Sequence, residues 1–211
     1  MRRFAAGVGG GSRRRAAARD DRGAALLEFA LVGAPLLFIL FAIIEIGLIF
    51  AGNVNLDNAV LSVARQVRLG AMVLPGMAAT TSSGTQTDLA DFKKKVCQNM
   101  VMVTNATCLS QLQVDVRVLS SFGSSPPNPI SGTNFSSSSF CFYSGVPGNI
   151  VSIRAYLLWP VATPVLLPTL TNITSISGSS GSSTGSFFVL MADEAFVNEP
   201  NSAGTNTNAG C

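Results

Sequence analysis

Residues 29–52 read FALVGAPLLFILFAIIEIGLIFAG, an apolar run in which Glu45 is the single charged side chain. As an α-helix, this run of 24 residues would rise about 36 Å, which is enough to cross a hydrocarbon core of about 30 Å. We therefore predict one transmembrane helix over residues 24–52. Pro35 removes a backbone hydrogen bond inside this helix, so we expect a bend about one turn from its start.

The charges of the chain are divided unevenly around this helix. Residues 1–23 hold seven arginines and two aspartates, a net charge of +5, whereas the whole chain carries +3. Because arginine and lysine accumulate on the cytoplasmic side of membrane spans, we expect residues 1–23 to form a basic cytoplasmic leader. The rest of the chain then lies across the membrane.

The basic charge does not indicate a nucleic-acid partner. Phosphate binding needs lysines and arginines clustered on the folded part of a protein. The one such run in the body is Lys93, Lys94 and Lys95. A solvated helix face is favoured for this run, and a binding patch is the alternative.

Composition limits the chemistry that the chain can perform. Its 211 residues suit one folded domain besides the anchor, and 47% hydrophobic against 12% charged residues exclude a wholly disordered chain. The absence of histidine excludes a histidine general base, a Ser-His-Asp triad and a histidine-ligated zinc site. Asp193 and Glu194 are neighbours on a predicted strand and point to opposite faces, so they make no catalytic carboxylate pair. We expect no enzyme activity, no metal and no cofactor.

The four cysteines are typical of disulfides formed in an oxidising compartment. They are Cys97, Cys108, Cys141 and Cys211, and they allow three pairings. Proximity favours Cys97 with Cys108, and Cys141 with Cys211 then follows by default. The sequence leaves the other pairings open.

Beyond the span, the hydrophobic period indicates a helical stem. Apolar residues recur every three or four positions at Leu56, Val60, Val63 and Val67. This period predicts an amphipathic stem helix over residues 53–70. A second helix is predicted over residues 87–101, with Asp88 as its N-terminal cap.

The remaining body reads as strands and loops. Residues 112–118 alternate between apolar side chains and Gln113, Asp115 and Arg117, which predicts a half-buried strand. Further strands are predicted at 150–159 and 186–196. Prolines make 161–170 a poor membrane helix, so this range is predicted to be a loop or an edge segment. The Ser-, Gly-, Thr- or Pro-rich ranges 120–139 and 171–186 are predicted to be mobile linkers or loops. The predicted architecture is α+β, in which a long N-terminal helix precedes an extracytoplasmic domain, residues 71–211, with a short antiparallel sheet.

The sequence Gly23-Ala24-Ala25-Leu26-Leu27-Glu28-Phe29 lies where the basic segment meets the apolar run. It resembles the processing motif of type IVb prepilins and pseudopilins, in which a membrane aspartyl peptidase cuts after a small residue. The resemblance implies a cut between Gly23 and Ala24, with Glu28 as the fifth mature residue. Phe29 stands where that group often has Tyr or Phe. Glycine has no Cβ to obstruct the approach of the scissile backbone to the peptidase.

Glu28 is the residue of this motif with a definite expected role. Cleavage would leave a cationic amine at Ala24, and a carboxylate one turn along offers it an opposite charge. Because an ionisable side chain in an apolar span is costly, we expect Glu28 to pair with the mature N-terminal amine of an adjacent subunit. The competing interpretation places Glu28 at the headgroup boundary. For Glu45, snorkelling and pairing are both open, and no function is assigned to it.

Patches outside the anchor extend the resemblance to TadE-like proteins of tight-adherence pilus systems. Residues 64–70, ARQVRLG, resemble the stem of that group, and residues 195–200, AFVNEP, resemble its Asn-Glu-Pro ending. Residues 150–160 resemble the strand before that ending. A turn after a strand explains the Asn-Glu-Pro tripeptide equally well.

The resemblance implies a minor pseudopilin that helps to build or initiate a tight-adherence (type IVb) pilus. The implied partners are a prepilin peptidase, other pseudopilins or the major pilin, inner-membrane pilus assembly proteins and the lipid bilayer. The implied location is the inner (cytoplasmic) membrane, with the N-terminus cytoplasmic and the C-terminal domain periplasmic or extracellular. The alternative is an uncleaved single-pass envelope protein with a structural or binding role and no part in a pilus.

Two other targeting signals fit the sequence less well. A Sec signal peptide needs a short apolar core followed by an Ala-x-Ala site, and FAGN at residues 50–53 is a poor site. SRRR at residues 12–15 resembles a twin-arginine signal, but the long Leu- and Ile-rich segment beyond it favours a stable span.

Overall fold

The computed structural model describes residues 21–69, 84–143, 145–163, 173–178 and 181–199. The chain divides into two units between Ile39 and Leu40. The first unit contains the inner part of the long helix α1 (Asp21–Arg68), and the second contains its outer part and the folded domain.

Helix α1 has 48 residues and continues through Pro35. Among the described residues, it is the one helix long and apolar enough to cross a membrane, and its most apolar stretch has a mean hydropathy of 2.6. This composition indicates a single-pass membrane anchor. The bend expected at Pro35 stays a prediction. The outer part of α1 has the predicted amphipathic stem, since its four periodic side chains are at most 4% exposed: Leu56, Val60, Val63 and Val67.

Two shorter helices follow, α2 (Gly84–Asn99) and α3 (Asn105–Gln111). Helix α2 already includes residues 84–86, which precede the predicted boundary, so position 88 lies inside the helix and not at its N-terminal cap. A disulfide between Cys97 and Cys108 joins the two helices, with a Cα–Cα distance of 5.6 Å. This confirms the first predicted pairing. Cys211 lies outside the described residues, so its pairing with Cys141 stays a prediction.

The domain has a six-stranded sheet with the order β1-β4-β6-β5-β3-β2. The strands are β1 (Leu112–Leu119), β2 (Ile130–Ser131), β3 (Asn134–Ser136), β4 (Ile150–Pro160), β5 (Ile173–Gly178) and β6 (Gly181–Val197). The α+β class is confirmed. The sheet is mixed rather than purely antiparallel, because β3 and β5 pair in parallel.

Two ranges predicted to be mobile loops hold strands instead. Residues 120–139 contain β2 and β3, and residues 171–186 contain β5 and the start of β6. The physical reason is the length of β6, which runs for 17 residues and extends beyond its pairing with β4. Its free end pairs with β5, so the Ser- and Thr-rich backbone finds hydrogen-bond partners there.

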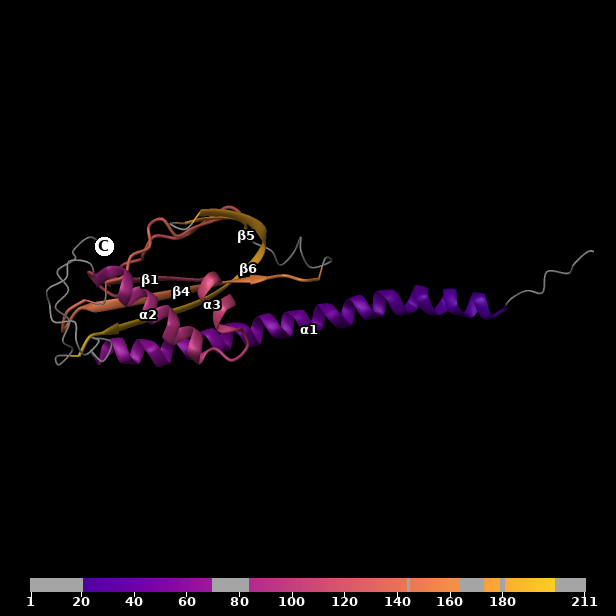
Figure 1. Ribbon diagram of the computed structural model, residues 1–211, viewed down its shortest axis with the longest axis horizontal. Coiled ribbons are helices and arrows are strands. Elements are labelled where there is room, and N and C mark those ends of the chain that lie inside the picture. Colours follow the sequence, from indigo (N-terminus) through magenta and orange to yellow (C-terminus); the bar gives the residue numbers. More distant parts are fainter. Residues whose placement is uncertain (1–20, 70–83, 144, 164–172, 179–180, 200–211) are drawn as a thin grey trace, which may run out of the picture. The chain divides into compact units, whose positions relative to one another are not determined.

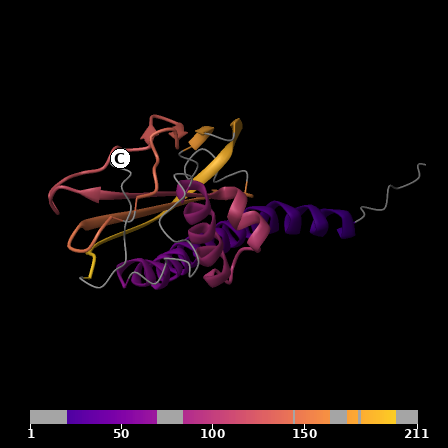
Figure 2. The same ribbon diagram turned by 60° about the vertical axis from the view of Figure 1, so that its left-hand side comes forward.

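The sheet is covered on both faces. The outer part of α1, together with α2 and α3, packs on one face of β1, β4 and β6 (Figures 1 and 2). On the other face, β5 and β3 curl over the strands and close a smaller, aromatic-rich cluster (Figure 1). That cluster consists of Phe135, Tyr156, Leu158, Ile173 and Val189. Strand β4 is therefore buried on both of its faces.

Candidate functional site

The predicted processing residues lie at the start of α1. Gly23 and Ala24 lie within the described part of α1, and Glu28 lies about one turn further along. Gly23 is exposed, and a Cβ added to it would meet nothing within 4 Å. Nothing in the described fold therefore requires glycine at this position. A requirement for glycine would come from the peptidase.

The expected scissile bond is helical in the full-length chain. A peptidase that binds its substrate as an extended backbone would first have to unwind this turn.

Glu28 and Phe29 are both exposed, Phe29 at 77%. Ala24 and Glu28 are four residues apart on one helix, so they lie on the same helix face. The ion pairs among the described residues involve other side chains, and none includes Glu28. The carboxylate of Glu28 is thus exposed and takes no part in these ion pairs. The predicted roles of Gly23, Ala24, Glu28 and Phe29 stay predictions.

Glu45 has the opposite environment. It is 7% exposed, and its carboxylate accepts hydrogen bonds from two consecutive backbone N–H groups that follow β4. The N–H of Ala162 lies 2.6 Å from Oε1, and the N–H of Thr163 lies 2.9 Å from Oε2. The sequence left the role of Glu45 open, and the structure binds it within the domain.

From Glu45 outward, one face of α1 packs closely on the sheet. Gly52 makes the closest approach, since a Cβ added there would lie 3.2 Å from Leu190 Cδ1 and 3.3 Å from Trp159 Cζ3. Asn53 then accepts a hydrogen bond from the backbone N–H of Met191, at 3.3 Å. A larger residue at position 52 would push α1 away from β4 and β6.

Two sequence patches that carried the family resemblance contact each other. Arg68, in the last turn of α1, forms an ion pair with Glu199 at 3.3 Å, and the N–H of Glu199 donates to the carbonyl of Arg68 at 3.2 Å. Asn198 is buried and its N–H donates to the carbonyl of Asn149, at 3.0 Å. Glu199 therefore ties the end of β6 to the end of the stem helix, whereas Asn198 ties it to the loop before β4. Pro200 lies outside the described residues.

A buried charge cluster on β1 and β4 was not predicted. Asp115 is fully buried and binds two arginines, Arg117 at 2.7 Å and Arg154 at 2.6 Å. The alternation in the sequence predicts that Asp115 and Arg117 lie on the polar side of a half-buried strand, which is wrong for both residues. The reason is that residues 120–143 fold over this face and remove it from solvent.

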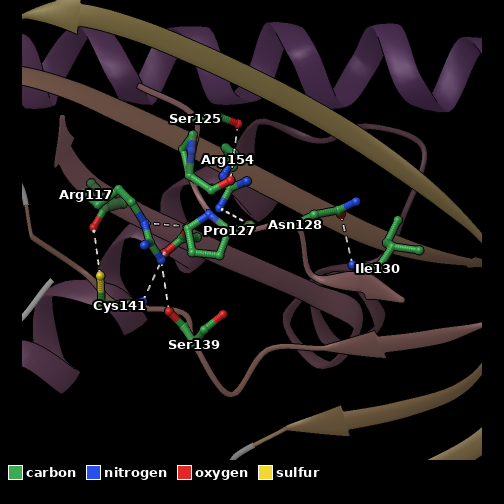
Figure 3. Close-up of polar contacts among 11 residues, drawn as sticks. Arg117, Ser125, Pro127, Asn128, Ile130, Ser139, Cys141 and Arg154 are labelled. Carbon is green, nitrogen blue, oxygen red and sulfur yellow. Dashed lines mark hydrogen bonds and ion pairs between the residues drawn. The ribbon is translucent and has the colours of Figure 1, made fainter. Parts of the chain in front are cut away.

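The cluster binds the covering segment through its backbone (Figure 3). Arg117 donates to the carbonyl of Ser139 and Arg154 to the carbonyl of Pro127, each at 2.9 Å. The N–H of Cys141 donates to Asp115 at 3.1 Å. An arginine inside the apolar run 150–158 is the sequence signal that could have revealed this cluster, because a buried charge needs a partner.

Asp193 lies beside the cluster, since it is directly opposite Arg154 in the register of the neighbouring strands β4 and β6. Burial raises the pKa of Asp193 above its usual value, and the charge of Arg154 acts in the opposite direction. Burial also raises the pKa of Glu194, and the charges of Asp193 and then Asp57 of α1 add to this rise. Among the described residues, no three of the His, Cys, Asp and Glu side chains gather as a metal site.

The lysine run on α2 is only partly the solvated face that the sequence predicts. Lys94 is exposed, whereas Lys93 and Lys95 are half-buried. Burial lowers the pKa of Lys93, and Lys95 donates to the side chain of Gln66 at 2.9 Å. Part of the run therefore helps to dock α2 on α1.

Comparison with known proteins identifies the N-terminal part of the chain. Residues 23–65 match the family model of TadE-like protein. This confirms the resemblance over the junction, the apolar run and most of the stem. No curated protein and no solved structure matches the chain.

Proposed function

On the premise that residues 23–65 are those of a TadE-like protein, we propose that the chain is a minor pseudopilin-like component for assembly of a tight-adherence (type IVb) pilus. A prepilin peptidase cuts it between Gly23 and Ala24. The family match carries this proposal, because it begins at Gly23, the residue before the expected cut.

The proposed role is structural rather than catalytic. The chain is anchored in the inner membrane by α1, with its basic leader in the cytoplasm and its domain in the periplasm or outside the cell. Its partners are the peptidase, other pseudopilins or the major pilin, and inner-membrane pilus assembly proteins. The charge asymmetry supports this orientation, since residues 1–23 carry a net charge of +5.

Glu28 acts between subunits in this proposal. Its carboxylate pairs with the amine that cleavage exposes on Ala24 of a neighbouring subunit. Two observations support this role: Glu28 is exposed, and large apolar side chains around it are also exposed, Leu26 at 71% and Leu31 at 70%. Neighbouring helices in the membrane would contact these side chains.

The N-terminus of the mature chain tests the cleavage step. Mass spectrometry of the protein purified from its native membrane should show a chain that begins at Ala24. Gly23→Leu should keep the leader attached, because the added side chain obstructs the peptidase while meeting nothing in the fold. Gly47→Leu is the matched control, since position 47 is equally open and should be processed normally. An intact leader in the wild type would favour the uncleaved envelope protein.

Piliation tests the role of Glu28. Glu28→Ala should be cleaved as the wild type is, but cells that carry it should lack surface fibres in electron micrographs. Glu28→Asp keeps the charge and should restore some fibres. Normal piliation with Glu28→Ala would count against the pairing with the N-terminal amine.

A further inference from the structure

The outer end of the membrane-embedded helix can be located from what covers each residue of α1. Up to residue 44, the large apolar side chains of the helix are all at least 50% exposed. At Glu45 the carboxylate is suddenly enclosed by the backbone of Ala162 and Thr163. Four residues further along the helix, Ile49 is buried, with 8% of its surface exposed.

The exposed residues of the inner part surround the helix on every side. Six consecutive large side chains are 50–63% exposed: Leu36, Leu37, Phe38, Ile39, Leu40 and Phe41. Successive residues of a helix point about 100° apart, so this run covers the whole circumference. One partner helix would cover a single stripe, whereas lipid covers all sides. The partner that fits this surface is therefore a bilayer.

The length of this part matches the thickness of a bilayer. Residues 25–44 form a run of 20 residues, which as a helix rises about 30 Å, the thickness of the hydrocarbon core. If the hydrocarbon instead reached Gly52, the amides of Ala162 and Thr163 and the carboxylate of Glu45 would all lie within it. Backbone at that depth is tolerated only inside protein or beside water.

Apolar side chains just beyond Glu45 fit the headgroup region. On the side of α1 away from the domain, Ile46 is 49% exposed and Phe50 is 72% exposed. Phe50 lies about 8 Å beyond Glu45 along the helix axis, which is about the depth of one headgroup layer. This layer accommodates apolar side chains next to polar ones.

We propose that the hydrocarbon core of the membrane ends at Glu45, so that the folded domain rests directly on the bilayer surface. The lipid-embedded segment is then residues 25–44, and Glu45 with the amides of Ala162 and Thr163 forms the side of the domain that faces the membrane. This inference rests on the anchoring of α1 in a membrane, and it is independent of cleavage and of any pilus.

Cysteines placed on one helix face at three depths test the proposal. Ile43→Cys, Phe50→Cys and Leu61→Cys replace residues that are 65%, 72% and 45% exposed, so the protein itself shields none of them. The spacings of 7 and 11 residues keep all three on the same face of α1. Each full-length variant is reconstituted in lipid vesicles with the domain outside and treated with a membrane-impermeant maleimide, with the wild type as the control for native cysteines.

We expect Leu61→Cys and Phe50→Cys to react in intact vesicles and Ile43→Cys to react only after detergent is added. If Phe50→Cys is protected while Leu61→Cys reacts, the hydrocarbon edge lies beyond Glu45. This result would overturn the proposed position of the edge, but the membrane anchor itself would stand. Reaction of Ile43→Cys in intact vesicles would overturn the level and the anchor together.

The native fluorophore gives a second readout without substitution. Trp159 is the single tryptophan of the chain and packs against Gly52, about 10 Å beyond Glu45 along the helix. Lipids brominated deep in the acyl chain should leave its fluorescence unchanged. Strong quenching by such lipids would contradict the proposed level.

Discussion

Glu28 and Glu45 are both glutamates of helix α1, yet their surroundings are opposite. Glu28 is exposed and pairs with none of the described residues, whereas Glu45 is 7% exposed and both of its oxygens accept backbone hydrogen bonds. A carboxylate whose partners lie inside the chain contributes to the fold. For Glu28, the proposed partner is the N-terminal amine of a neighbouring subunit.

The same difference extends to the two parts of α1. The large apolar side chains of the inner part are exposed, whereas the outer part buries one face against the sheet. We therefore expect substitutions in the outer part to change the stability of the domain and those in the inner part to leave it unchanged. Unfolding of the full-length protein in detergent micelles, followed by the fluorescence of Trp159, measures that stability.

The largest effect on the unfolding free energy of the domain is expected at Asp115. Asp115→Ala leaves Arg117 and Arg154 buried without their counter-charge, which should cost about 3–5 kcal/mol of unfolding free energy. Membrane insertion should not change, because the inner part of α1 is untouched. Asp193→Ala is the control, because Asp193 keeps far more contact with solvent than the fully buried Asp115 and its loss should cost much less. Equal losses in the two variants would refute a special role for the buried carboxylate.

A pair of leucines compares the two parts of α1 directly. Leu56→Ala removes a fully buried side chain and should cost about 2–5 kcal/mol of unfolding free energy. Leu37→Ala removes a side chain that is 53% exposed and should leave the unfolding midpoint unchanged. If the two variants lose the same stability, the inner part contributes to the domain and the proposed division of the helix is wrong.

The two glutamates give the next smaller effect. Glu45→Ala leaves the amides of Ala162 and Thr163 without their acceptor, which should cost about 2 kcal/mol of unfolding free energy. Glu28→Ala should not change this free energy. Hydrogen exchange at the two amides should become faster in the first variant only, and unchanged exchange there would show that Glu45 does not hold this segment.

The smallest effect is expected where the stem meets the end of β6. The Arg68–Glu199 pair is about half exposed, so removing it should cost less than about 1 kcal/mol. A double-mutant cycle with Arg68→Ala and Glu199→Ala measures the coupling between the two side chains. A coupling well above that value would mean that this contact contributes to the fold as a buried pair does.

The anchor and the main elements of the domain could be predicted from the sequence because each has a local signal. The apolar run of α1, the helical period of the stem and the alternation of β1 are visible within a few turns or residues. The Cys97–Cys108 disulfide followed from proximity in the chain, and the structure confirms it. Strands β2, β3 and β5 lack such a signal, because their Ser- and Thr-rich backbone becomes a strand only where β6 offers it partners.

The sequence by itself determined where a membrane helix lies, which of its ends is basic, and that a glutamate follows a glycine junction by five residues. These features depend on composition and spacing along the chain. Only the tertiary structure decided that Glu45 accepts hydrogen bonds from Ala162 and Thr163, which lie more than 100 positions away in the sequence. It also decided that Asp115 is buried between two arginines and that Arg68 contacts Glu199. The physical reason is that the environment of a charge is set by segments distant in sequence, which the folding of the sheet brings to it.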